Sequence, residues 1–485
     1  MKKSHILLSV LMLSASLMAQ VRTGTIWGHV TDTQGASLPG VSVTLKSPFS
    51  APITAVTDEQ GIFRFVSIEP SNKYALTAEL QGFKKQEKTG IVVTLGTQSR
   101  IDLTMEQGKI EEEVTVVAVT PTVDAKKTSV GKNVNQEILQ SLPTARDPWV
   151  VMQMTPSINM DRENVGGSES GQQSGFYAKG DPTGGNNNVW AIDGVVVTDP
   201  SAIGGSPAYW DFDSFEEMDI VTGGADVSIQ TGGVALNMVT RRGGNKVSIG
   251  GRFYLTDSAF QANNLTQALI DEGVTGTNKI NQIKDYGFNL GGPIIKDKLW
   301  LWGSYGVQDI NEVNLVGMPQ IPILTNYNFK LNVQPVPSNR FEALFICGKK
   351  TFIGRNAEAD FPGGWDQDDP YHFGSPIIKL QDEQTIGQDL LLSAKFGYMG
   401  NAFSFSTHND PTGVKLATVD ATAGVWSTWG DFVTRRPMWD YDFHAQYTTT
   451  SCSVSATRSS WASNIRPAAR LRTLGTLVSS SSLTT

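Results

Sequence analysis

The N-terminal part of the chain is a series of short stretches in which apolar and polar residues alternate. Seven such stretches are separated by turn signals such as Leu38-Pro39-Gly40. Their ranges are 25–32, 41–47, 53–58, 62–68, 74–80, 91–96 and 100–105. Alternation with a period of two is typical of half-buried strands, and short strands spaced by about ten residues predict a small β-sandwich.

Residues 125–244 contain shorter elements and many glycines. Helical turns are expected in 135–143 and 147–158, the second with Pro148 in its first turn. Two apolar runs joined by Asp193-Gly194 predict a hairpin. Further short strands are expected in 212–224 and 234–245. We therefore predict a small mixed α/β domain in this region.

Strand-like runs become longer from residue 245 onward. Each has about ten residues, with aromatic residues near its ends, and short joins alternate with long polar loops. The runs are 246–256, 285–295, 298–308, 326–335, 340–350, 389–399 and 439–449, and the two long loops are 258–284 and 351–388. This pattern is typical of an outer-membrane β-barrel, and a soluble β-protein is the alternative.

Composition restricts the function classes. The net charge is −8 and no basic stripe interleaved with aromatic residues occurs, so nucleic acid is not expected as a partner. Two cysteines and five scattered histidines do not form a metal-site pattern. The acidic loop Asp366, Asp368 and Asp369 does not follow the EF-hand spacing, and a solvated loop is favoured over a calcium site. With no nucleophile elbow or phosphate loop, we expect no enzyme and no cofactor.

The first residues predict export. Lys2 and Lys3 precede an apolar run that ends in small residues, and residues 1–19 are interpreted as a secretory signal peptide. A membrane anchor is the alternative, but the run is shorter than the ~20 residues that a spanning helix requires.

Several motifs in this order resemble known families. Residues 23–106, with "GHVTDTQGASLPGVSVTL", "TDEQGIFRF" and "YALTAELQGF", resemble the carboxypeptidase-regulatory-like domain, a transthyretin-like β-sandwich. The segments "EEEVTVVA", "VWAIDGVVVTDP", "FEEMDIVTGG" and "LGGPIIKDKLWLWGSY" resemble the TonB box, the plug and an early barrel hairpin of TonB-dependent outer-membrane receptors. Together they cover residues 20 to about 450, which resemble that receptor family in the branch with an extra N-terminal sandwich.

The resemblance implies a mainly β protein with a transthyretin-like sandwich, a small α/β plug domain and a partial antiparallel transmembrane β-barrel. The expected parts are a signal peptide (1–19), the sandwich (20–106), a TonB-box-like linker (107–124), the plug (125–244), an incomplete barrel (245–450) and a low-complexity tail (451–485). Only about eight barrel strands are expected, whereas a barrel that encloses a plug needs about 22. The serine-rich tail lacks strand alternation, and we interpret it as out-of-frame sequence or a disordered tail, which predicts a truncated receptor.

The resemblance also implies site residues. The TonB-binding segment would be Glu112, Glu113, Val114, Thr115, Val116 and Val117, which alternatively form a simple linker. The plug motif would be Asp193, Gly194, Gly223, Gly224, Arg241 and Arg242, the two arginines being either paired with acidic lumen residues or solvated. Trp300 and Trp302 alternate with Leu299 and Leu301, so both faces of this strand are apolar, and we expect the tryptophans at the membrane interface.

The expected function is active uptake of a ligand across the outer membrane. The ligand would be a siderophore, an oligosaccharide or a peptide, and the partners would be the periplasmic TonB energy-coupling protein and outer-membrane lipid. The alternative is a secreted or surface β-protein that binds carbohydrate or protein.

Overall fold

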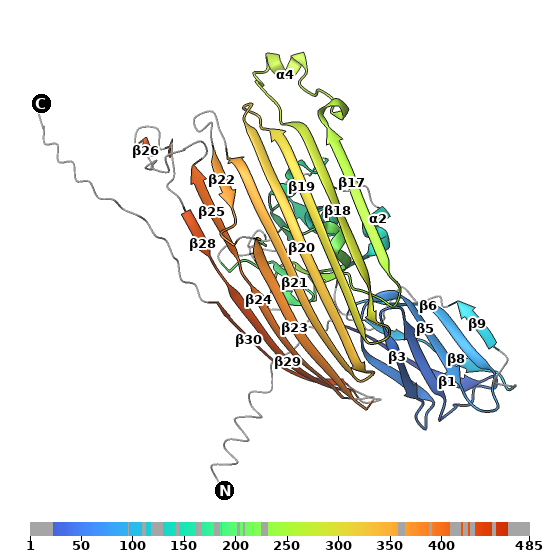
Figure 1. Cartoon of the computed structure of the whole chain (residues 1–485). Coiled ribbons are helices and arrows are strands. Elements are labelled where there is room, and N and C mark those ends of the chain that lie inside the picture. Colours follow the sequence, from blue (N-terminus) through green and yellow to red (C-terminus); the bar gives the residue numbers. More distant parts are fainter. Residues whose placement is uncertain are drawn as a thin grey trace, which may run out of the picture.

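The protein is mainly β in the computed structural model and has three parts along the chain (Figure 1). The described residues are 23–463 without 96, 109–112, 118–129, 142–144, 162–163, 165, 179–184, 186, 201–203, 207–208, 225–230, 357–363, 372, 388–389, 408–418, 421–424, 427–431 and 449–452. The predicted signal peptide and most of the predicted tail lie outside them. Within the described part, none of the helices has the length and apolar character that a membrane crossing requires.

The first part is a β-sandwich of two sheets. One sheet has the order β3-β2-β5-β6-β9, and the other has β4-β1-β7 with β8 also on β1. The strands are β1 (Gly24–Asp32), β2 (Ser42–Ser47), β3 (Ser50–Val56), β4 (Ile62–Ile68), β5 (Ser71–Glu79), β6 (Lys85–Val93), β7 (Gln98–Arg100), β8 (Leu103–Met105) and β9 (Glu113–Val117). Alternate side chains of β1 are buried between the sheets, beginning with Ile26, which is what its period-two pattern predicts.

The second part, called the plug below, comprises the described residues of 130–244. Its five-stranded sheet has the order β10-β15-β16-β13-β14, and β11 and β12 form a separate antiparallel pair. The plug strands are β10 (Val130–Asn135), β11 (Ile158–Met160), β12 (Phe176–Ala178), β13 (Val189–Ile192), β14 (Val195–Val196), β15 (Phe215–Gly223) and β16 (Ala235–Thr240). The helices are α2 (Gln136–Ser141), α3 (Pro148–Gln153), η1 (Ser168–Gly171) and η2 (Phe212–Ser214). Pro148 begins α3 as expected, and Asp147 caps it by accepting from Val150 N at 2.8 Å.

The third part is a long antiparallel sheet, which curves around the plug (Figure 1). Its main path runs β17-β18-β19-β20-β21-β23-β24-β29-β30, and β22, β25 and β28 lie off this path. The strands are β17 (Ser248–Asp257), β18 (Lys279–Ile295), β19 (Leu299–Val313), β20 (Pro319–Val336), β21 (Asn339–Arg355), β22 (Trp365–Asp368), β23 (Ser375–Ile386), β24 (Leu390–Met399), β25 (Ala402–Thr407), β28 (Phe432–Arg435), β29 (Met438–Thr448) and β30 (Ser453–Ser463). A separate pair is β26 (Val419–Asp420) with β27 (Val425–Trp426), and the loop after β17 holds η3 (Ser258–Phe260) and α4 (Gln267–Asp271). Among the described residues the sheet does not close, because β17 and β30 are its two ends.

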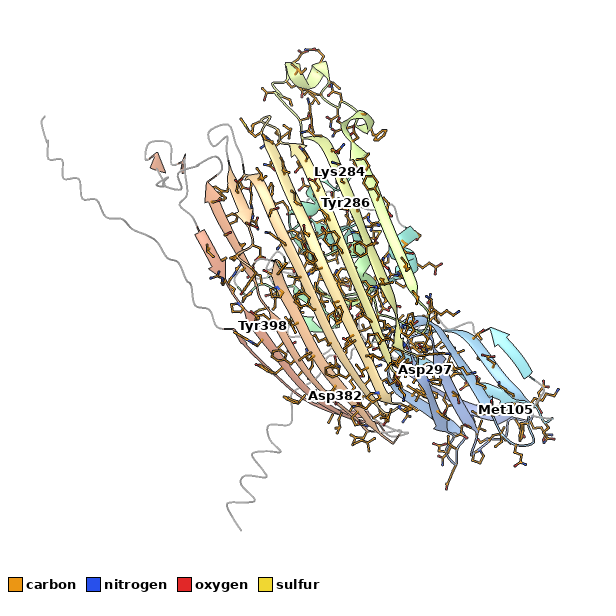
Figure 2. All side chains as sticks on the ribbon, viewed as in Figure 1. Met105, Lys284, Tyr286, Asp297, Asp382 and Tyr398 are labelled. Carbon is orange, nitrogen blue, oxygen red and sulfur yellow. The ribbon has the colours of Figure 1, made fainter. Side chains whose placement is uncertain are left out.

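The two ends of this sheet differ. Figure 2 shows Asp297, in the turn between β18 and β19, beside the sandwich, whereas Lys284 lies farther along β18. The end at this turn is called the sandwich end, and the end that carries α4 is called the loop end.

The inward and outward faces of β20 differ in polarity. Its buried side chains point to the inner side of the sheet and are largely polar, including Asn326, Asn328, Lys330, Asn332 and Gln334. Between them, Tyr327 and Phe329 are exposed on the outer face. Apolar residues outside and polar residues inside are the arrangement of outer-membrane strands, because one face meets lipid and the other meets the lumen.

The apolar core of the plug continues onto the inward face of the sheet. Trp190, which is 1% exposed, lies at the centre of aromatic contacts with Trp149 and Phe176. The same apolar cluster includes Leu344 of β21 and Ile377 of β23. The plug therefore packs against the sheet through a shared core.

The predicted orientation of Trp300 and Trp302 is wrong. They are 1% and 2% exposed and face inward, with Trp300 Nε1 donating to Asn245 Oδ1 at 2.8 Å. Trp302 is the cross-strand neighbour of Lys330, which also points inward, and the period of two then places Leu299 and Leu301 outside. The aromatic residues that face outward are others, including a row of Phe288, Tyr305 and Tyr327 with centroids 5.9 and 5.3 Å apart.

Two further expectations about strands are wrong. The predicted loop 351–388 contains β22 and β23, the latter with twelve residues. The predicted tail contains β30, which pairs with β29. Buried and more exposed side chains alternate along β23, and several of the buried ones are charged, such as Lys379 and Glu383. These charged residues made the segment resemble a polar loop in the sequence.

Candidate functional site

The predicted TonB-binding segment forms a strand at the edge of the sandwich. β9 pairs in parallel with β6, so that Val114 is opposite Gln86 and Val116 is opposite Lys88. It is the last strand of its sheet in the described part of the chain. Glu112 lies outside the described residues. The segment is thus able to join a sheet by main-chain hydrogen bonds, which is the property that strand addition requires.

Asp193 and Gly194 form the turn between β13 and β14, both with positive φ, 43° and 67°. The carboxylate of Asp193 accepts from Thr240 N at 3.0 Å and also binds the Thr240 hydroxyl. Its Oδ2 lies 2.9 Å from Nζ of Lys330 on β20. The Asp-Gly turn therefore supplies a buried carboxylate that joins the plug to the sheet.

The other plug-motif residues occupy the strand ends. Gly223 ends β15, and Gly224 follows with a φ of 60°. Arg241 N donates to Ser214 O at 2.8 Å. The guanidinium of Arg242 is buried, donates to Pro70 O at 3.0 Å and is ion-paired with a carboxylate of the sandwich. The acidic partner of Arg242 is therefore in the sandwich, and neither of the two expected environments applies to it.

A cavity of about 920 Å³ lies at the loop end of the sheet, between the plug and the strand ends. Side-chain amides contribute much of its lining, namely Gln172, Gln173, Asn264, Asn278, Asn314 and Gln320. Aromatic rings of Tyr209, Phe403 and Phe405 also line it. Such a surface offers donors, acceptors and flat apolar faces to a polar ligand.

The cavity holds basic side chains in fixed positions. Lys350 Nζ is buried and donates to Tyr209 Oη at 3.0 Å and to Gln172 Oε1 at 3.3 Å. Arg355 Nη1 donates to Gln367 Oε1 at 2.5 Å, and its guanidinium stacks 5.0 Å from the centroid of Phe405. Among the described residues, no carboxylate lies within ion-pair distance of Lys350. These side chains place N–H donors at the cavity wall, where acceptor groups of a ligand are able to meet them.

A second arginine of the cavity is paired. Arg436 Nη1 lies 2.8 Å from Asp199 Oδ1, and its guanidinium lies 5.0 Å from the centroid of Phe403. Two residues of the cavity wall, Asp368 and Asp369, belong to the acidic loop for which the sequence favoured a solvated loop over a calcium site, and the other wall residues were not singled out in the sequence. They come from plug loops and several strands far apart in the chain, and isolated amides and arginines carry no local motif.

Glu217 gives the plug a pH-dependent stability. Burial raises the pKa of its carboxyl to about 7, against hydrogen bonds from Asn133 and Leu95 N. The folded state therefore binds the proton more tightly than the unfolded state, and stability falls as the pH rises from the ordinary carboxyl pKa to about 7. Glu217→Gln is expected to be stabilising at pH 8 by about 2 kcal/mol and near neutral at pH 4.5. Thermal unfolding of both proteins at the two pH values tests this, and a difference independent of pH would contradict it.

Comparisons with known proteins find one matching domain family and two similar curated proteins. A family model described as carboxypeptidase regulatory-like domain matches residues 25–106. Over 294 residues the chain is 30% identical to the TonB-dependent transporter Oar of Myxococcus xanthus, covering 59% of this chain and 27% of that protein. It is 25% identical over 185 residues to the TonB-dependent receptor P26 of Formosa agariphila, covering 38% and 17%.

A solved structure with a similar fold is the siderophore receptor PirA from Acinetobacter baumannii. The TM-score is 0.50 at 15% identity, covering 69% of this chain and 48% of that one. The chain thus spans about a quarter or less of the curated relatives and about half of this structure. The family model matches the sandwich, and this chain is similar to TonB-dependent transporters and receptors and carries a carboxypeptidase regulatory-like domain.

Proposed function

We propose that this protein is an outer-membrane receptor that takes up a ligand by a TonB-dependent mechanism. The polarity of β20 carries the proposal, because exposed Tyr327 and Phe329 alternate with buried Asn326, Asn328 and Lys330. A soluble sandwich would not direct its lysine and amides inward and its aromatic rings outward. The names of the relatives, a transporter and a receptor, support the same class and no enzyme.

The cavity at the loop end is proposed as the ligand site. The sandwich and β9 lie toward the other end of the sheet, where a periplasmic partner would act, so the loop end would face the exterior (Figure 1). The amide, basic and aromatic lining favours a polar ligand, of the kind represented by a siderophore, an oligosaccharide or a peptide.

The coupling step is proposed to use β9. A strand of TonB would add to Glu113–Val117 by main-chain hydrogen bonds, which are strong along the strand and reversible. Tension applied there would be transmitted to the plug, which is joined to the sheet by buried polar contacts such as Asp193–Lys330.

The membrane assignment is tested by a charge on the outer face. Phe329→Arg is expected to lower the fraction recovered in outer membranes and the heat-modifiable gel shift, because arginine on the lipid face costs about 2–4 kcal/mol near the bilayer centre. Leu269→Arg, in exposed α4, is the matched control and should change neither. Recovery of the unmodified protein in the soluble periplasmic fraction, or an unaffected Phe329→Arg variant, would contradict the proposal.

A further inference from the structure

The sandwich is seated closely on the sandwich end of the sheet. Ala51 N donates to Gln334 Oε1 at 3.0 Å, and Asn245 N donates to Pro48 O at 2.6 Å. The approach is so close at Gly244 that a Cβ atom there would lie 2.8 Å from Pro48 O. The loops between β2 and β3 and between β4 and β5 therefore form a fitted contact with the rest of the chain.

Glu69, in the turn between β4 and β5, is the charged centre of this contact. Its Oε1 lies 3.3 Å from Nη1 of Arg340 on β21, and its Oε2 is ion-paired with Arg242. The hydroxyl of Tyr74 donates to the carbonyl oxygen of Glu69 at 2.9 Å and so holds the turn in place. The ring of Phe49 lies 4.9 Å from the guanidinium of Arg242 and covers it.

A second set of hydrogen bonds connects the sandwich with the sheet. Arg340 Nη2 donates to Ser67 Oγ at 3.2 Å, and Ser67 Oγ donates to Glu383 Oε2 at 2.8 Å. Ser67 has a φ of 56°, a conformation that is unfavourable for serine. The sandwich thus inserts both an acid and a hydroxyl between charged side chains of the plug and the sheet.

These groups surround one small cavity of about 50 Å³ where the sandwich, the plug and the sheet meet. This three-way contact is called the seam below. Its charged lining consists of four basic residues, Arg242, Lys330, Arg340 and Lys379, and four acidic residues, Glu69, Asp193, Glu342 and Glu383. The charges balance, four against four, only when Glu69 is counted, and Glu69 is the charged residue that the sandwich contributes. Without the sandwich, three carboxylates would face four cations.

An unbalanced buried charge is unfavourable, because desolvation is no longer offset by a partner. Separation of the sandwich would therefore admit water to the seam and weaken the ion pairs that hold the plug to the sheet. Docking of the sandwich would in turn favour the arrangement in which these ion pairs keep the plug bound to the sheet. The position of the sandwich and the stability of the plug are thus linked through Glu69.

We propose that the sandwich has a further function as a removable cap on the seam, and that Glu69 is the group that keeps the sandwich docked there. The cap excludes water from the seam while it is docked and releases the plug contacts when it leaves. This function depends on the charges of the seam and does not depend on the identity of the ligand or on TonB.

Hydrogen exchange in the full chain tests the cap. The amides of Ala51 and Asn245 report docking, because their acceptors lie across the seam, whereas Val41 N donates within the sandwich to Thr57 Oγ1. In the unmodified protein, exchange at the two seam amides is expected to be faster than at Val41. Glu69→Gln is expected to accelerate exchange at the seam amides at least tenfold and to leave Val41 unchanged.

The matched control is Glu79→Gln, which removes a half-exposed acid of the same sandwich, 3.7 Å from Lys85, and should leave the seam amides unchanged. A tether then distinguishes release of the cap from local unfolding. With Cys347 and Cys452 replaced by alanine, Ala51→Cys and Gln334→Cys are joined by a short bifunctional maleimide, which should restore slow exchange at Asn245 in the Glu69→Gln background. Equal seam exchange in Glu69→Gln and the unmodified protein, fast exchange that the tether does not slow, or seam amides as slow as Val41 would each overturn the proposal.

Discussion

Replacing Val114 and Val116 with proline is expected to weaken binding of the full chain to the periplasmic domain of TonB by about 100-fold. Proline removes the backbone N–H and clashes with regular pairing in a strand. Both positions lie inside β9, so the two substitutions remove donors from the segment proposed to join the partner's sheet. Titration of the detergent-solubilised chain with the TonB domain measures the change.

The control for this experiment keeps the amides. Val114→Thr with Val116→Thr retains β-branching and both N–H groups, and binding is expected to stay within about threefold. The heat-modifiable gel shift should be the same for all three proteins, because β9 lies at the edge of the sandwich and not in the long sheet. Equal affinity of the proline variant and the unmodified chain would show that this segment is only a linker.

Lys330→Met is expected to lower the free energy of unfolding by about 3–5 kcal/mol. Lys330 is 3% exposed, and its ammonium lies 2.9 Å from Asp193 and 3.2 Å from Glu342. Without it, the carboxylate of Asp193 remains buried with hydrogen bonds from Thr240 but without a cation. Denaturant titration of the full chain in the same detergent, followed by tryptophan fluorescence, measures the loss.

Three further variants identify the cause of this loss: Lys349→Met, Asp193→Asn alone, and Asp193→Asn combined with Lys330→Met. Lys349→Met removes a partly exposed lysine of β21 from a surface pair with Asp368 of β22, and it should cost less than about 1 kcal/mol. Adding Asp193→Asn to Lys330→Met removes the orphaned charge and should recover at least half of the stability. Additive losses in this double-mutant cycle would mean that the two side chains do not stabilise one another.

Local patterns predicted the strands well where one period dominated. The sandwich strands, the Asp193-Gly194 turn and the long strands β19, β20 and β24 follow from alternation and turn residues close together in the chain. The prediction was poorest where inward polar residues imitate a loop. In β23, Lys379 and Glu383 point inward because their ion-pair partners on β21, Glu342 and Arg340, lie there. The sequence of β23 alone does not identify these partners.

The site was less predictable than the fold. The motif residues Asp193 and Arg242 were identified, but their partners, Lys330 and Glu69, lie 137 and 173 residues away along the chain. The cavity residues at the loop end have no motif at all, because each contributes one amide, cation or ring to a surface that exists only after folding.

The sequence by itself determined that the chain is a β-protein with a sandwich, a glycine-rich plug and long strands, since a period of two and turn residues are local properties. Only the tertiary structure decided which face of each strand is inside. For Trp300 and Trp302 both faces are apolar, so the choice depended on the neighbouring strand, where Lys330 requires the interior because its carboxylate partners are there. The contact of Glu69 with two arginines likewise depended on how the sandwich meets the sheet, which no local pattern encodes.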